Sequence, residues 1–126
     1  MPTLLVVDDV ATDRLRIAGL AARWMNSIVL QAADGATALT MIEQHQPDIV
    51  LTDLHMPEMD GFTILEKMKS SETLRDVPVI VVSGGDLTPE QQQQLQDFGH
   101  RMIQKNALNE KQLLTTLERV LERVKH

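Results

Sequence analysis

Short apolar runs that alternate with helical patterns are the feature that most constrains this chain. The runs are unbroken by polar residues and lie at residues 4–7, 28–30, 49–51, 79–82 and, more weakly, 102–103. Unbroken runs of this length are typical of strands that are buried on both faces of a sheet. The alternation therefore predicts an α/β fold, in which a doubly wound five-stranded parallel sheet with right-handed crossovers carries five helices on its two faces.

The helices are predicted from apolar residues that recur every three or four positions. The apolar positions of the five helices fall within residues 17–25, 38–45, 61–69, 91–98 and 113–124. Capping boxes mark two of the starts, because Thr88 precedes Gln91 and Asn109 precedes Gln112 by three residues. Gly99 is expected to end the fourth helix, whose few apolar residues predict loose packing on the sheet.

Composition excludes several classes of protein. The chain has 126 residues, of which 43% are hydrophobic and 24% charged, so we expect residues 1–126 to form one globular domain. It has no cysteine, which excludes a disulfide framework and a thiol nucleophile. A formal charge of −6 and an aromatic content of 2% argue against direct contact with nucleic acid. Without a bilayer-length apolar run or a signal peptide, the protein is expected to be soluble and cytoplasmic, with no membrane insertion.

Polar side chains follow four of the five predicted strands. Asp8 and Asp9 follow the first strand, Asp53 the third, Ser83 the fourth and Lys105 the fifth. Ligands of a doubly wound sheet bind outside the carboxyl ends of its strands, so we expect these side chains to converge on one edge. Each aspartate taken alone is more often a turn former or a helix cap. Their convergence is therefore the signal that points to a site.

The predicted convergence suggests a metal site that can receive a phosphoryl group. Three carboxylates repel one another unless a cation lies between them, and oxygen ligands suit Mg²⁺. The formal charges of Asp8, Asp9, Asp53, Lys105 and one Mg²⁺ cancel. The metal and the lysine would neutralise phosphoryl oxygens, and the Ser83 hydroxyl would donate to another. Asp53, after the central strand, is the predicted nucleophile, and the product would be an aspartyl phosphate.

Several segments share one register with a known family. They are LVVDD at residues 5–9, Asp34 with Gly35, DLHMPEMDG at residues 53–61, PVIVVSG at residues 78–84, and Lys105. In these segments the chain resembles the response regulator receiver domain of two-component signalling, including the chemotaxis regulators, over nearly all of its length. The resemblance implies a flavodoxin-like sheet with strand order 2-1-3-4-5.

The resemblance also implies roles for individual residues. Asp53 would be the phosphoacceptor, supplied by a histidine kinase or a histidine phosphotransfer protein. Asp9, Asp53 and the His55 backbone carbonyl would bind Mg²⁺ directly, and Asp8 would help through a water molecule. Ser83 would be the switch hydroxyl and Lys105 the residue that binds the phosphoryl group. Such a domain is not an enzyme beyond self-phosphorylation and slow autodephosphorylation, and it acts on a downstream protein target.

Two positions depart from the family pattern, one three residues before Lys105 and one directly after it. Met102 replaces an aromatic residue that changes rotamer on activation, and Asn106 replaces a proline that commonly follows the lysine through a cis peptide. A cis bond before a residue other than proline costs about 2.5–4 kcal/mol, so we expect a trans bond here. Residues 87–90 and 103–105 resemble the receivers of hybrid sensor histidine kinases.

Three alternative functions fit the sequence less well. A receiver-like binding module that phosphorylation does not control would be expected to lack an acid or the lysine, and all are retained. An aspartate-dependent phosphatase similar to the haloacid dehalogenases would need an acid at the position of His55. A flavodoxin-like electron carrier would not place Asp8, Asp9 and Asp13 near a flavin phosphate.

Overall fold

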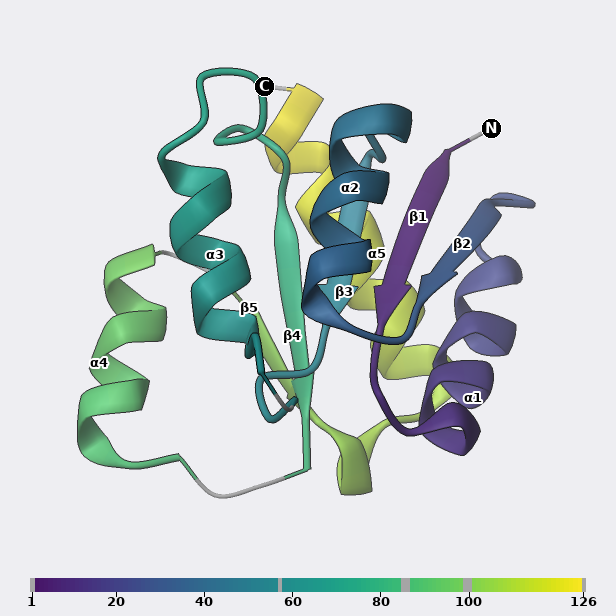
Figure 1. Ribbon diagram of the computed structural model, residues 1–126. Helices are drawn as coiled ribbons and strands as arrows, with labels where there is room; N and C mark the ends of the chain where they lie inside the picture. The colour runs from purple at the N-terminus through teal and green to yellow at the C-terminus, as the bar shows by residue number, and fades with distance from the viewer. Residues whose placement is uncertain (1, 57, 85–86, 99–100, 126) are drawn as a thin grey trace.

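A computed structural model describes residues 2–56, 58–84, 87–98 and 101–125, with the backbone alone given for residues 97, 98, 101 and 123–125. The five strands form one parallel sheet in the order β2-β1-β3-β4-β5, as predicted (Figure 1). Their bounds are β1 (Thr3–Val7), β2 (Ile28–Ala32), β3 (Ile49–Thr52), β4 (Val79–Ser83) and β5 (Arg101–Gln104). All strands run in one direction, so their carboxyl ends share the lower edge of the sheet in Figure 1.

Burial along the strands follows their place in the sheet. All residues of β3 and β4 are buried, as expected for inner strands that are covered on both faces. The prediction of two-sided burial is wrong for β2, where Ile28 is 46% exposed. This strand lies at the edge of the sheet and pairs only with β1.

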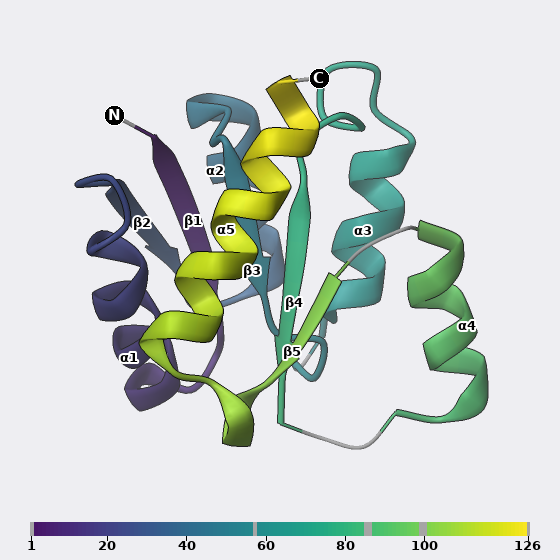
Figure 2. The ribbon, with the colours of Figure 1, turned by 180° about the vertical axis from the view of Figure 1, so that it is seen from behind.

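Five α-helices cover the sheet in two layers (Figures 1 and 2). One core joins the sheet to α2 (Gly35–His45), α3 (Gly61–Lys69) and α4 (Pro89–Phe98). The other joins its opposite face to α1 (Ala11–Ala22) and α5 (Glu110–Lys125). The layered arrangement confirms the predicted doubly wound fold.

The helix bounds match the sequence pattern closely in all helices except α1. The apolar pattern predicted that the first helix runs through Met25, but α1 ends at Ala22. Met25 adopts a φ of 52° and is 54% exposed, so its assignment to the buried stripe was wrong. Trp24 is buried as predicted, beyond the end of the helix. The expected end of the fourth helix at Gly99 lies outside the described residues, as do the side chains of Phe98 and Val124.

Both predicted capping pairs lie at helix starts, and the pair at α4 forms the reciprocal box. The Thr88 hydroxyl accepts from the Gln91 backbone N–H at 3.2 Å, and the Gln91 side chain accepts from the Thr88 N–H at 3.0 Å. At the start of α5, the Asn109 side chain accepts from the Gln112 N–H at 2.8 Å. These bonds satisfy N–H groups that have no partner within the helix.

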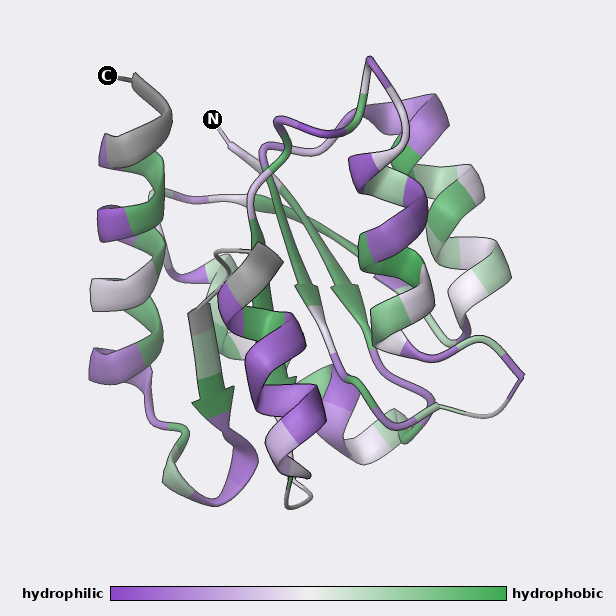
Figure 3. Ribbon diagram, turned by 90° about the vertical axis from the view of Figure 1, so that its left-hand side faces the viewer, coloured by the Kyte–Doolittle hydropathy of each residue, from purple (hydrophilic) through white to green (hydrophobic). Residues whose placement is uncertain are grey.

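The polar character of α4 is evident in Figure 3, where this helix is mostly hydrophilic and the strands behind it are hydrophobic. Among residues 89–96, Leu95 is the buried side chain. The described residues contain no helix that is both long enough and apolar enough to span a bilayer.

Candidate functional site

The acidic residues after β1 and β3 leave the sheet side by side. Val7 and Thr52 are partners in the register of the two strands, so Asp8 and Asp53 follow at the same edge. Carboxylate oxygens of Asp8, Asp9 and Asp53 all lie within 4.8 Å of one another. Asp8 and Asp53 are buried, with 0% and 5% exposure, whereas Asp9 is exposed. The predicted gathering of the three carboxylates is therefore present.

The amine of Lys105 lies among these carboxylates. Lys105 begins a short 3₁₀ turn, η1 (Lys105–Ala107), directly after β5. Its Nζ atom is 2.7 Å from Asp8 Oδ2 and 3.0 Å from Asp53 Oδ2. A third carboxylate oxygen, Asp13 Oδ2 in the first turn of α1, lies 3.0 Å from the same amine. One ammonium group is thus shared by three carboxylates.

Asp13 is a residue of the site that the sequence prediction did not include. It was recognised only as part of an acidic first loop and not as a partner of Lys105. No spacing in the sequence marks Asp13, because its contact with Lys105 depends on how α1 packs against the turn after β5. With this fourth carboxylate, the formal charge of the site with one Mg²⁺ is −1, and the predicted cancellation does not hold.

Burial and ion pairing shift two pKa values in the site. Burial raises the pKa of Asp8, although the amine of Lys105 and the backbone N–H of Val10 favour its ionised form. Burial of Lys105 opposes its charge, but hydrogen bonds to Asp8, Asp53 and Asp13 outweigh that effect and raise the lysine pKa above its ordinary value. The lysine is therefore cationic throughout the physiological pH range.

Ser83 ends the strand that lies between Asp53 and Lys105. It is fully buried and pairs in register with Gln104, the residue before the lysine. Within the described part of the chain, its Oγ atom has no hydrogen-bond partner. Since buried hydroxyl groups are normally paired, this hydroxyl is available to a group that enters the site.

The segment between β3 and α3 fixes the backbone around Asp53. The exposed His55 donates its backbone N–H to Asp53 Oδ1 at 3.2 Å. The Asp60 side chain caps α3 by accepting from the Thr63 N–H at 2.9 Å. A Cβ atom on Gly61 would lie 2.5 Å from the Asp53 carbonyl oxygen, so only glycine fits here without a backbone shift.

Two arginines of α1 support the site through its backbone. Arg14 donates to the carbonyl of Asp8 at 3.0 Å, and Arg16 donates to the carbonyl of Leu108 at 2.7 Å. The sequence prediction named neither residue. Both contacts reach main-chain oxygens, and no pattern of residue types marks such contacts in advance.

The donor set fits a hard divalent cation. It consists of carboxylate oxygens within 4.8 Å of one another, and such oxygens are the preferred ligands of Mg²⁺. Together with Asp13 and the amine of Lys105, these carboxylates leave a formal charge of −3 before a metal binds. A divalent cation would therefore add to a site that accommodates positive charge.

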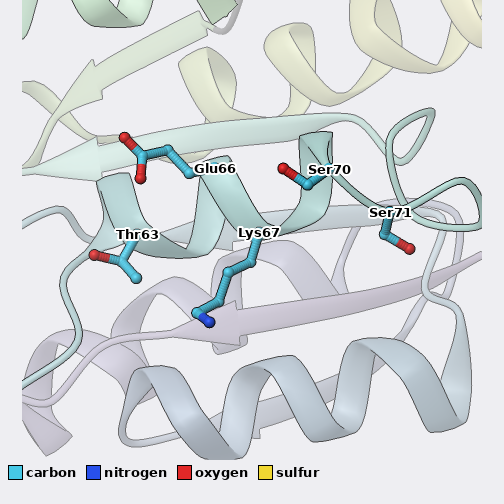
Figure 4. Close-up of a pocket in the computed structure, with 5 residues that line it drawn as sticks. All are labelled: Thr63, Glu66, Lys67, Ser70 and Ser71. Atoms are coloured by element: carbon cyan, nitrogen blue, oxygen red, sulfur yellow. The ribbon is translucent and has the colours of Figure 1, made fainter.

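A shallow pocket of about 370 Å³ lies elsewhere, along α3 (Figure 4). Its lining is polar and includes none of the acidic or basic residues of the site. The lining residues are Thr63, Glu66, Lys67, Ser70 and Ser71.

The peptide bond between Lys105 and Asn106 is trans, since the described residues contain no cis peptide bond. This confirms the expectation based on the absence of a proline after the lysine. Lys105 contacts the carboxylate cluster with a trans bond at this position.

Comparison with known proteins places residues 4–118 in the family described as the response regulator receiver domain. The chain is 45% identical over 84 residues to response regulator PleD of Caulobacter vibrioides, a match that covers 66% of this chain and 18% of PleD. It is 39% identical over 66 residues to the chemotaxis protein CheY of Bacillus subtilis, covering 52% of this chain and 55% of CheY. The chain thus spans about a fifth of the length of PleD.

Solved structures show the same fold. The structure of Vibrio cholerae chemotaxis protein CheY4 matches with a TM-score of 0.84 and 28% identity, covering 96% of this chain and 99% of that chain. The signal receiver domain of a signal transduction histidine kinase from Syntrophus aciditrophicus matches with a TM-score of 0.87, covering 100% of this chain and 94% of that chain. At 24% identity, this second likeness concerns the fold alone.

Proposed function

The chain belongs to the response regulator receiver domain family, and we propose that Asp53 accepts a phosphoryl group in a Mg²⁺-dependent reaction that switches a partner-binding surface. The phosphoryl donor is a phosphohistidine, carried by a histidine kinase or a histidine phosphotransfer protein. The observation that carries this proposal is the contact of Lys105 Nζ with Asp53 Oδ2 at 3.0 Å, inside a cluster of three further carboxylates.

Asp53 would be the nucleophile. A carboxylate oxygen forms a bond to phosphorus while the phosphorus–nitrogen bond of the donor breaks and its electron pair stays on the nitrogen. The donor ring, protonated at its other nitrogen, leaves as neutral imidazole. Lys105 neutralises one of the phosphoryl oxygens as the group arrives, and it does so in a largely buried position where charge is poorly screened.

The acidic residues would hold the metal. Asp9, Asp53 and the His55 backbone carbonyl are the proposed direct ligands, and Asp8 would act through a water molecule. The buried Asp8 also forms an ion pair with the amine of Lys105, so it links the metal ligands to the lysine. When it is bound, Mg²⁺ supplies charge neutralisation at the phosphoryl oxygens.

Ser83 would detect the phosphoryl group. Its buried hydroxyl has no partner among the described residues, so a phosphoryl oxygen offers it a hydrogen bond that the resting protein lacks. A movement of Ser83 would reach the segment that follows it, including α4, whose burial rests largely on Leu95. Met102 lies half-buried on β5. Because its side chain is flexible and has no aromatic ring, it would repack without one preferred orientation. We place the resulting partner surface at α4 and β5.

We propose that residues 1–126 form one receiver domain that acts in the cytoplasm, as predicted from the sequence.

A test of the acceptor residue is chemical trapping. The protein is incubated with phosphoramidate and Mg²⁺ and then reduced with borohydride, which converts an aspartyl phosphate to homoserine. We expect homoserine at position 53 alone; homoserine at position 8, 9 or 13 would overturn the assignment of Asp53.

A further inference from the structure

Helix α1 contacts both the side-chain amine and the backbone carbonyl of Lys105. Asp13 Oδ2 accepts from the lysine Nζ at 3.0 Å. Arg16 Nη1 donates to the lysine backbone carbonyl at 3.4 Å, and Arg16 Nη2 donates to the Leu108 carbonyl at 2.7 Å. Asp13 and Arg16 are three residues apart on one helix, so both side chains lie on the same side of α1.

Apart from one backbone hydrogen bond, from the Leu108 N–H to the Lys105 carbonyl at 3.3 Å, the turn that carries Lys105 has little other support. None of the residues of η1 (Lys105–Ala107) is buried, so core packing does not fix the turn. Asn106 follows the lysine through a trans bond, and no proline ring restricts the backbone of Lys105. The next buried side chain is Leu108, at the far end of the turn. Arg16 spans the turn by contacting the carbonyls at both of its ends.

We propose that Asp13 and Arg16 are positioning residues for Lys105. Arg16 fixes the main chain of the turn, and Asp13 draws the amine toward α1. These contacts keep the lysine amine beside Asp53, although no proline follows Lys105 to restrict the backbone of the turn. The contact between Arg16 and Leu108 is charge-assisted, the stronger class of hydrogen bond, and it joins segments 92 residues apart. This inference rests on the proposed role of Lys105 in binding the phosphoryl group.

The test of Arg16 is a double-mutant cycle with Lys105. The rate constant for phosphorylation by acetyl phosphate is measured at saturating Mg²⁺ for Arg16→Met, Lys105→Met and the double variant. We expect Arg16→Met alone to be about ten-fold slower, because misplacement by an ångström can cost up to about 100-fold. In the Lys105→Met background, Arg16→Met should cause no further loss. An equal slowing in both backgrounds, or a folded Arg16→Met protein with the wild-type rate, would overturn the proposal.

Arg23→Met is the matched control. Arg23 also links α1 to the segment after β5, through a 3.1 Å ion pair with Glu110, but it does not contact the turn of Lys105. The Arg23→Met protein should be phosphorylated at the wild-type rate. Arg16→Lys, which keeps a charged donor, should recover part of the rate that Arg16→Met loses. A general loss of stability in Arg16→Met would reduce Mg²⁺ affinity, whereas displacement of the lysine amine from Asp8 and Asp53 would not reduce it.

Two readouts do not depend on phosphorylation. In the protein without donor, Arg16→Met should speed hydrogen exchange at the amides of residues 105–108, and Arg23→Met should not. Asp13→Asn should increase the mobility of the Lys105 side chain in carbon-13 relaxation, with the exposed Lys111 as an internal reference. If the wild-type protein is not phosphorylated at all, the proposed function fails and these two measurements still decide the positioning. Unchanged exchange and unchanged relaxation would contradict it.

Discussion

Lys105 and Asp13 are 92 residues apart in the chain, yet the lysine Nζ lies 3.0 Å from the aspartate Oδ2. The same amine also contacts Asp8 and Asp53, so the site without metal is organised around a single ammonium group. A metal ion held by the proposed ligands would draw on Asp53 directly and on Asp8 through water, and both carboxylates also contact the amine. Binding of the metal and placement of the lysine are therefore coupled through charge.

Removal of the lysine charge should strengthen metal binding. In Lys105→Met, Asp8 and Asp53 lose the cation that neutralises them, and we expect Mg²⁺ affinity to rise about ten-fold, since each 1.4 kcal/mol changes an affinity by this factor. Phosphorylation should nevertheless slow. Isothermal titration calorimetry measures the affinity, and Lys111→Met, which removes an exposed lysine charge, is the control. Weaker Mg²⁺ binding in Lys105→Met than in Lys111→Met would contradict this account.

Neutralisation of Asp8 should stabilise the metal-free fold near neutral pH. Burial raises the pKa of Asp8, so folding disfavours its ionised form. This group therefore reduces stability above its raised pKa, and the cost disappears as the pH falls toward the ordinary value of 3.8. In EDTA at pH 7, Asp8→Asn should melt at a higher temperature than wild type, and the difference should shrink in acid. The exposed Asp9→Asn should change stability by no more than about 0.5 kcal/mol. A lower melting temperature for Asp8→Asn would refute the prediction.

Gly61 should be intolerant of a methyl group. In Gly61→Ala the new Cβ would meet the Asp53 carbonyl oxygen at 2.5 Å, so the backbone of the acceptor residue must move. We expect a loss of about 1–3 kcal/mol in stability and slower phosphorylation. Gly19→Ala is the matched control, because a Cβ there meets no atom within 4 Å. In the interior of α1 it should stabilise the protein by about 0.4–1 kcal/mol. Chemical denaturation of both variants checks the pair, and equal stabilities would count against the close approach at Gly61.

A phosphoryl mimic should change the segment after Ser83. Beryllofluoride with Mg²⁺ is expected to engage the Ser83 hydroxyl and to alter hydrogen exchange in α4 and β5, while α2, on the same face of the sheet, keeps its protection. The comparison is made on one sample with and without the mimic. Unchanged exchange in α4 and β5 would exclude them as the switched surface.

The fold was predictable because the inner strands are apolar without interruption. β3 and β4 are buried along their whole length, and this burial leaves a plain signal in the sequence. Met25 was misassigned because its apolar side chain continues the helical spacing, although the backbone turns into the left-handed region there. The burial of β2 was overestimated because a run of apolar residues does not tell an edge strand from an inner one.

The site was predictable to the extent that its residues follow strands. Asp8, Asp9 and Asp53 gather as expected because parallel strands end at one edge. Asp13 and Arg16 reach Lys105 from a helix, and their contacts depend on how α1 packs against the turn after β5. Such packing distances are set by the tertiary fold and leave no periodic signal in the chain.

The central claim is that Asp53 accepts a phosphoryl group only when a divalent cation is bound. Intact mass spectrometry after incubation with acetyl phosphate tests it most directly, with wild type and Asp53→Asn each measured in Mg²⁺ and in EDTA. The account predicts a gain of one phosphoryl group for wild type in Mg²⁺ and no gain in the other three samples. A stable gain in EDTA, or in Asp53→Asn with Mg²⁺, would contradict it.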